Sequence, residues 1–180
     1  MANKLTKAKL KKHLAHLEQK ELIDEIANLF VKFKEVKQYY QMEYGSEADR
    51  AALLKDYKKK IDKEFYTRGG TPRYPKAVNL RKLITEFKKI STFKYDLIEL
   101  TLYRVELAIR FSNNFGGMDE SFYQATLNAY HDAINMISAE RLDQEFKETA
   151  LKLVNDTYNT SWGFYDAMQN VYSIVYVEFE

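Results

Sequence analysis

Residues 96–110, Asp-Leu-Ile-Glu-Leu-Thr-Leu-Tyr-Arg-Val-Glu-Leu-Ala-Ile-Arg, decide the fold that this sequence predicts. Ile98, Leu102, Val105 and Ile109 recur at steps of four, three and four residues, which places them on one face of an α-helix. Further apolar residues lie beside this row, so we expect this helix to be the most buried in the protein. Its remaining polar side chains form a stripe that we expect to face solvent: Asp96, Glu99, Tyr103, Glu106 and Arg110.

The same apolar spacing continues along almost the whole chain and predicts about nine amphipathic helices, each burying one face. The first is expected near residues 6–16, with Thr6 as its N-cap. Gly45 is expected to end the third helix, and Ser46 and Asp49 have the spacing of a capping box that begins the fourth. Further apolar rows lie within residues 22–33, 54–65, 80–90, 123–137, 142–153 and 165–179.

The composition indicates an all-α protein. Only 6 Gly and 2 Pro occur in 180 residues, so the chain holds few of the residues that interrupt helices. Apolar residues make up 46% of the chain and charged residues 30%, as is usual for a globular protein with its own core. Because short loops connect the predicted helices, we expect an antiparallel bundle or a stack of helix hairpins.

The clearest break in the helical pattern lies at residues 67–75, Thr-Arg-Gly-Gly-Thr-Pro-Arg-Tyr-Pro. This segment contains both prolines and two adjacent glycines. We expect a single all-helical domain over residues 1–180, with a candidate subdomain boundary here. It would separate N-terminal helices in residues 1–66 from a C-terminal bundle in residues 76–180.

Charge is distributed unevenly along the chain. Residues 55–94 contain 13 Lys or Arg against 4 Asp or Glu, a net charge of +9. Residues 95–180 contain 5 against 14, a net charge of −9, and the formal charge of the whole chain is only +2. We therefore expect a surface with oppositely charged poles, a property that affects binding partners more than it affects the fold.

Two kinds of binding site are suggested by the basic segment. The loop around Gly69 brings Arg68 and Arg73 near Lys76, where the start of the next helix offers free backbone amides to a phosphate or an acidic side chain. The loop lacks the Gly-x-x-x-x-Gly-Lys-Ser/Thr pattern of a nucleotide-binding loop, and a plain linker is the alternative that the sequence favours.

The second kind of site is a nucleic-acid surface along residues 55–94, where Lys59 and Lys63 would contact phosphates. The alternative is internal, because the acidic C-terminal half can pack against the basic segment and cancel much of its field. We favour this neutralisation, or the docking of a protein, over nucleic acid.

No catalytic or metal-binding motif stands out. His13 and His16 share one side of a helix, but lysines surround them and no carboxylate ligand is evident. His131 lies between apolar rows, and an enzyme site between His131 and Glu106 is the least favoured hypothesis. We expect no cofactor and no metal.

Several features indicate a cytoplasmic protein. There is no Cys, so a disulfide framework is excluded. Residues 1–7 lead directly into a charged helical pattern, without the apolar run of a signal peptide. No uncharged stretch approaches the ~18 residues of a membrane span.

Four segments carry a resemblance to a known family: residues 5–12, Leu-Thr-Lys-Ala-Lys-Leu-Lys-Lys; residues 22–26, Leu-Ile-Asp-Glu-Ile; residues 33–40, Phe-Lys-Glu-Val-Lys-Gln-Tyr-Tyr; and residues 76–89, Lys-Ala-Val-Asn-Leu-Arg-Lys-Leu-Ile-Thr-Glu-Phe-Lys-Lys. Together they make the chain similar to an uncharacterised family of small all-helical bacterial proteins, a domain of unknown function. The resemblance implies an all-helical fold and a bacterial origin, and it implies no activity.

The leading functional hypothesis is a non-enzymatic module that binds another protein or a second copy of itself. It depends on the polarised charge, the 14 tyrosines and the missing catalytic patterns. The alternative is a nucleic-acid-binding protein that uses residues 55–94.

Overall fold

A computed structural model describes residues 4–176 of the chain. Within this range the protein is all-α, as predicted, and no strand is formed apart from an isolated bridge between Tyr66 and Pro72. Phe179, at the end of the last predicted apolar row, lies outside the described residues. The helices are α1 (Lys7–Leu14), α2 (Gln19–Lys32), α3 (Lys34–Tyr44), α4 (Glu47–Phe65), α5 (Ala77–Ile90), α6 (Lys94–Phe115), α7 (Glu120–Glu140), α8 (Asp143–Asn155) and α9 (Phe164–Tyr172).

Local sequence signals place the helix ends. The Thr6 hydroxyl accepts a hydrogen bond from the backbone N–H of Lys9 at 3.3 Å, which caps α1. Ser46 and Asp49 form the predicted capping box at the start of α4, with each side chain accepting from the backbone N–H of the other residue. Gly45 directly follows α3, also as predicted.

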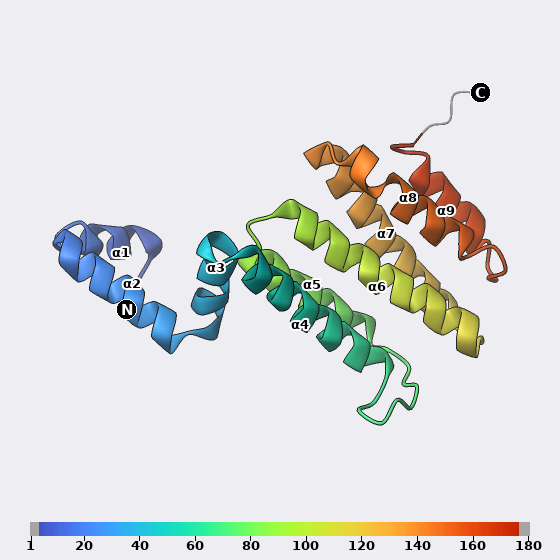
Figure 1. The fold of residues 1–180 in the computed structure, drawn as a ribbon, viewed down its shortest axis with the longest axis horizontal. Coiled ribbons are helices and arrows are strands. Elements are labelled where there is room, and N and C mark those ends of the chain that lie inside the picture. Colours follow the sequence, from blue (N-terminus) through green and yellow to red (C-terminus); the bar gives the residue numbers. More distant parts are fainter. Residues whose placement is uncertain (1–3, 177–180) are drawn as a thin grey trace.

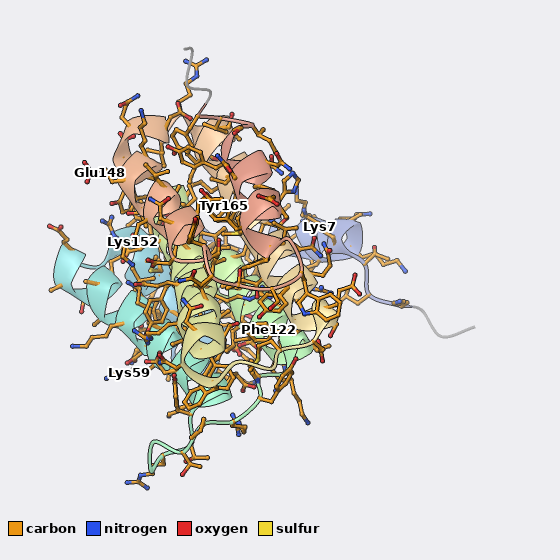
Figure 2. All side chains as sticks on the ribbon, turned by 90° about the vertical axis from the view of Figure 1, so that its right-hand side faces the viewer. Lys7, Lys59, Phe122, Glu148, Lys152 and Tyr165 are labelled. Atoms are coloured by element: carbon orange, nitrogen blue, oxygen red, sulfur yellow. The ribbon has the colours of Figure 1, made fainter. Side chains whose placement is uncertain are left out.

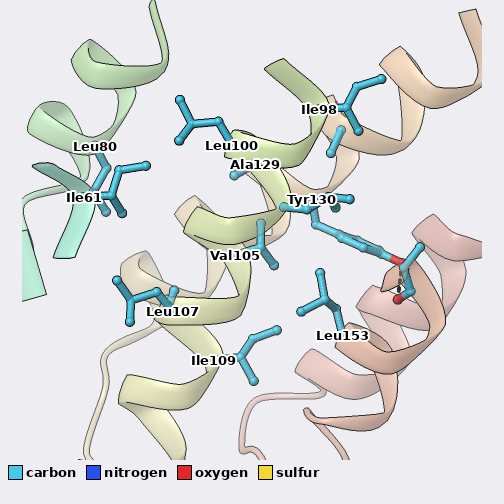
Figure 3. Close-up of a cluster of buried hydrophobic side chains, with 14 of the residues drawn as sticks. Ile61, Leu80, Ile98, Leu100, Val105, Leu107, Ile109, Ala129, Tyr130 and Leu153 are labelled. Carbon is cyan, nitrogen blue, oxygen red and sulfur yellow. Dashed lines mark hydrogen bonds between the residues drawn. The ribbon is translucent and has the colours of Figure 1, made fainter. Parts of the chain in front are cut away.

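Helix α6 forms the centre of the core, and 13 of its 22 residues are buried, more than in any other described helix. It packs between α4 and α5 on one side and α7 and α8 on the other. Figure 3 shows apolar side chains of α6 pointing toward the helices on both of its sides. The buried Tyr130 of α7 extends this core toward α8, where its hydroxyl donates to the Ala150 carbonyl at 3.1 Å.

Helices α4 to α9 lie side by side as successive pairs, α4 with α5, α6 with α7 and α8 with α9 (Figure 1). The segment 67–75, where we placed the candidate subdomain boundary, is the loop that joins α4 to α5. Phe65 before this loop and Leu80 after it belong to the same hydrophobic core cluster. The body of the protein is therefore one packed unit across this loop.

The first two helices are arranged differently and form an arm, which we define as α1 and α2. Neither helix contains a buried residue, and the contacts of the arm with the rest of the chain run mainly through α2 and α3 (Figure 1). Phe33 alone separates α2 from α3, with an extended backbone at φ −119° and ψ 120°. The expectation that the apolar row at 22–33 is buried is therefore wrong, because Ile26 and Phe33 are exposed and Leu22 and Leu29 are only partly buried.

None of the helices in the described part of the chain combines the length and the apolar character that a membrane span requires.

Candidate functional site

The basic segment 55–94 forms a largely open surface. Lys55, Lys59 and Lys63 are exposed and repeat every four residues, so they form a row about 12 Å long on α4. Two of the thirteen basic side chains in this segment, Lys58 and Lys94, pair with carboxylates of residues 95–180 within the described range. The predicted neutralisation by the acidic half is thus confined to a few contacts at ion-pair distance.

The predicted anion-binding loop is occupied by the chain's own groups. The Arg73 guanidinium donates to the carbonyls of Lys63 and Glu64 and so closes the C-terminal end of α4. The Glu64 carboxylate lies 3.9 Å from Arg73 and accepts from the Asn79 amide at 2.9 Å, near the start of α5. Anion binding here stays a prediction, and an external anion would compete with Glu64.

The other residues predicted for this loop lie apart from that contact. Lys76 is the N-cap residue of α5, and Arg68 is exposed in the turn before Gly69. Lys59 lies on the α4 row, one helical turn before Lys63. The structure therefore brings Arg73 and Lys63 together and leaves Arg68 exposed to solvent.

We expected the polar stripe of α6 to face solvent, but the structure shows that much of it does not. Asp96 is buried, and its carboxylate lies 3.4 Å from the Arg50 guanidinium. Glu99 pairs with Lys58 at 2.6 Å. The Tyr103 hydroxyl donates to the Asp62 carboxylate at 2.5 Å. These contacts cross from α6 to α4 or to its first turn. The stripe is polar because it pairs with side chains of a neighbouring helix.

The three histidines lie outside any cluster of potential metal ligands in the described part of the chain. His13 and His16 are exposed, and no group of three metal-ligating side chains comes together in residues 4–176. His131 is exposed and contacts Asn135 at 3.3 Å, whereas Glu106 lies in a groove beside Lys152, at 3.3 Å. The two residues of the enzyme hypothesis are thus engaged by different neighbours.

The arm displays an unusual amount of apolar surface. Ile23 and Ile26 are about half exposed, and Val31 is 85% exposed. The arm also carries a concentrated positive charge, because α1 contains four lysines and no acidic residue. The arm thus joins a cationic helix, α1, to α2, whose apolar side chains are exposed and which itself has two lysines against three acidic residues. Exposed apolar surface of this kind is typical of a segment that docks on a partner.

Helices α8 and α9 lie at the opposite end of the molecule (Figure 1), where the sequence around their junction is aromatic and acidic and where Tyr165 is labelled in Figure 2. We define the acidic-aromatic end as Tyr158, Trp162 and Tyr165 with the carboxylates of Asp156 and Asp166. Tyr158 and Tyr165 contact edge to face at 5.4 Å. Trp162 is 67% exposed and has a left-handed backbone with φ 68°, which is unfavourable for a bulky residue.

Sequence reasoning missed one functional candidate, Arg104 of α6. This arginine is buried, and it lines a groove of about 400 Å³ between α5, α6 and α7. A signal was present, because Leu97, Thr101, Arg104 and Ala108 follow helical spacing and place one charge in an otherwise weakly polar row. A buried cation within the most buried of the described helices indicates a special environment.

Comparisons with curated proteins and with solved structures found no match. A comparison with family models matched residues 5–176, which include all nine helices described above. The match covers nearly the whole chain, so the resemblance seen in four segments extends over the complete set of helices. The chain belongs to DUF6155, a family of unknown function.

Proposed function

We propose that this protein is a non-enzymatic self-association module in which the arm of one copy docks on the acidic-aromatic end of a second copy. The observation that carries the proposal is the absence of any buried residue in α1 and α2. Isolated helices shorter than about 12–15 residues are marginal in water, and α1 has 8 residues and α2 has 14. Covering the apolar face of the arm would therefore stabilise it.

Charge complementarity favours a second copy as the occupant. Lysines crowd α1, whereas the far end carries Asp166 beside exposed aromatic rings, together with Asp156, which Lys152 of the same molecule already pairs at 3.0 Å. Carboxylates and the faces of aromatic rings both attract ammonium groups. The two surfaces lie at opposite ends of the long axis (Figure 1), so the arm of one molecule can meet the end of the next.

The first test measures the oligomeric state of the full chain by sedimentation velocity. We expect concentration-dependent association that Ile26→Glu abolishes, because a buried apolar contact contributes about 1.5–3 kcal/mol and a buried unpaired carboxylate opposes docking. Val78→Glu is the matched control. Val78 is also an exposed aliphatic residue, at 74% against 46% for Ile26, but it belongs to α5, outside both surfaces, so this variant should associate like the wild type.

A mixing experiment distinguishes this arrangement from an arm-to-arm contact. The Ile26→Glu variant keeps an intact acidic-aromatic end, and the Trp162→Ala variant keeps an intact arm. If the arm docks on the opposite end, each variant is monomeric alone and the mixture forms a dimer through its one intact contact. Self-association of Trp162→Ala alone would refute the proposed contact, and a monomeric wild type that binds a different protein would refute self-association.

Nucleic-acid binding is the second candidate, favoured by the exposed lysine row on α4. It predicts a mobility shift with DNA or RNA at low salt that weakens steeply as salt is added. Replacement of Lys55, Lys59 and Lys63 by glutamate should abolish the shift, whereas Ile26→Glu should not affect it. Absence of any shift at low salt would refute this function.

We also keep as proposals the bacterial origin implied by the resemblance and the cytoplasmic location suggested by the cysteine-free sequence.

A further inference from the structure

Arg104 is a buried cation without a carboxylate partner. This residue is only 8% exposed, and its Nη2 donates a hydrogen bond to the Ala125 carbonyl at 3.3 Å. Within the described residues no carboxylate lies at ion-pair distance from its guanidinium. A guanidinium has five N–H donors, and a buried charge is costly unless it is paired. This arrangement therefore lacks the anion that would balance it.

Three helices build the groove around this side chain, each with one face. On α5, Arg81 and Lys88 lie two turns apart. On α6, one side contributes Leu97, Thr101 and Arg104. On α7, Asn128 and Asp132 lie one turn apart. Arg81, Lys88 and Arg104 against Asp132 give the lining a net charge of +2. The groove thus concentrates positive charge where an anion would be partly shielded from water.

The electrostatic environment of Arg104 supports this interpretation. Burial and, to a smaller extent, the nearby positive charge of Arg81 lower the pKa of Arg104 to about 10, whereas Asp132 acts in the opposite direction. Arg104 is still protonated at neutral pH, so its charge must be accommodated. A bound anion would offset both the burial and the repulsion between the two arginines.

The remaining lining suits an organic molecule rather than a bare ion. The Asn128 carbonyl oxygen accepts from Gln124 at 3.0 Å, which leaves the Asn128 amide N–H groups as donors toward the groove. Ile84, Leu97 and Met136 supply apolar walls. A volume of about 400 Å³ falls within the range of small-molecule sites.

We propose that the groove between α5, α6 and α7 binds a small organic anion, whose carboxylate or phosphate group contacts Arg104 and Arg81 and whose apolar part lies against Ile84, Leu97 and Met136. Arginine suits this role because its planar fork binds both groups through paired hydrogen bonds. This site is separate from the arm and from the acidic-aromatic end, so the inference does not depend on the proposed self-association.

The test uses the full chain with phenyl phosphate and benzoate as probes and phenol as the uncharged control. Thermal unfolding and titration calorimetry report binding, since a ligand that binds only the folded state raises its melting temperature. The variants are Arg104→Met and Arg81→Gln. Arg110→Gln is the matched control, because Arg110 is an exposed arginine of the same helix that does not line the groove.

We expect at least one of the two anions, and not phenol, to stabilise the wild type. Arg81→Gln should weaken binding by about tenfold or more, because it removes charge-assisted hydrogen bonds. Arg104→Met should abolish binding and raise the melting temperature of the ligand-free protein, because an apolar side chain replaces an uncompensated buried charge. Arg110→Gln should bind like the wild type.

Four results would overturn the inference. Neither anion stabilises the wild type at millimolar concentration; phenol binds as well as the anions; or Arg104→Met lowers the melting temperature of the ligand-free protein, which would make Arg104 a structural residue. A loss of binding in Arg110→Gln equal to that in Arg81→Gln would show attraction by surface charge alone and would also refute the site.

Discussion

The Tyr103 hydroxyl makes a hydrogen bond that links α6 to α4. It donates to the Asp62 carboxylate at 2.5 Å, and burial together with this negative charge raises the pKa of Tyr103. The phenol is therefore protonated at neutral pH and acts as the donor. Such a bond, together with the Arg50–Asp96 and Lys58–Glu99 ion pairs, helps to fix the register of the two helices.

We expect Tyr103→Phe to lower the free energy of unfolding by about 1–2 kcal/mol, because Asp62 loses a donor in a partly buried position. Urea denaturation at neutral pH measures the loss. Tyr158→Phe is the control, since Tyr158 is exposed and its hydroxyl makes no described hydrogen bond. If Asp62→Asn and Tyr103→Phe proved additive in a double-mutant cycle, the contact would contribute nothing.

Asp96 gives the protein a dependence of stability on pH. Burial raises the pKa of its carboxyl above the ordinary value of 3.8, although Arg50 opposes this effect. The folded state therefore binds the Asp96 proton more tightly than the unfolded state. Its contribution to stability increases as the pH falls through the raised pKa toward 3.8.

We expect Asp96→Asn to remove this increase. The unfolding free energies of variant and wild type, measured at neutral and at mildly acidic pH, should differ most at neutral pH, where the wild type bears the cost of a buried charge. Glu148→Gln on the exposed side of α8 should leave the pH profile unchanged. An advantage of Asp96→Asn over the wild type at neutral pH that shrinks as the pH falls would agree, whereas parallel profiles would contradict the assignment.

At the scale of helices, the junction between α3 and α4 depends on close packing at Gly45. A Cβ atom added there would lie 2.3 Å from the Gln41 carbonyl oxygen, which belongs to the backbone and cannot move aside easily. The backbone of Gly45 has φ −71°, a value open to any residue. Glycine is therefore needed here for space and not for its conformational freedom.

We expect Gly45→Ala to destabilise the protein by about 1–3 kcal/mol through this overlap. Gly69→Ala is the matched control in the loop between α4 and α5, where no heavy atom lies within 4 Å of an added Cβ. That substitution should be neutral or slightly stabilising. Equal melting temperatures for the two variants in a thermal unfolding experiment would contradict the argument.

Some helices could be predicted from the sequence more completely than others. Periodicity and capping residues predicted α1, α4 and the central α6, because these signals act within one helix. The row at 22–33 has the same period as a buried row, but no local signal states whether another helix covers it. The roles of Asp96 and Arg104 were missed for a related reason, since both depend on neighbours far away in the sequence.

At the scale of the whole molecule, the separation of charge predicts how association responds to salt. Lysines of α1 and carboxylates of the acidic-aromatic end lie on surfaces, where added salt screens their attraction within about 10 Å. We expect the dissociation constant from sedimentation to rise as salt is added. Association that strengthens with salt would indicate a contact dominated by apolar residues instead.

The short connection at Phe33 gives such an assembly its geometry. This residue serves as the C-cap of α2 and the N-cap of α3, so the direction of the arm is determined by a single extended residue. In a head-to-tail contact, that direction determines the rotation from each subunit to the next. A rotation that divides a full circle gives a closed ring, and any other gives an open filament. The backbone angles of one phenylalanine would thus control whether growth of the polymer stops.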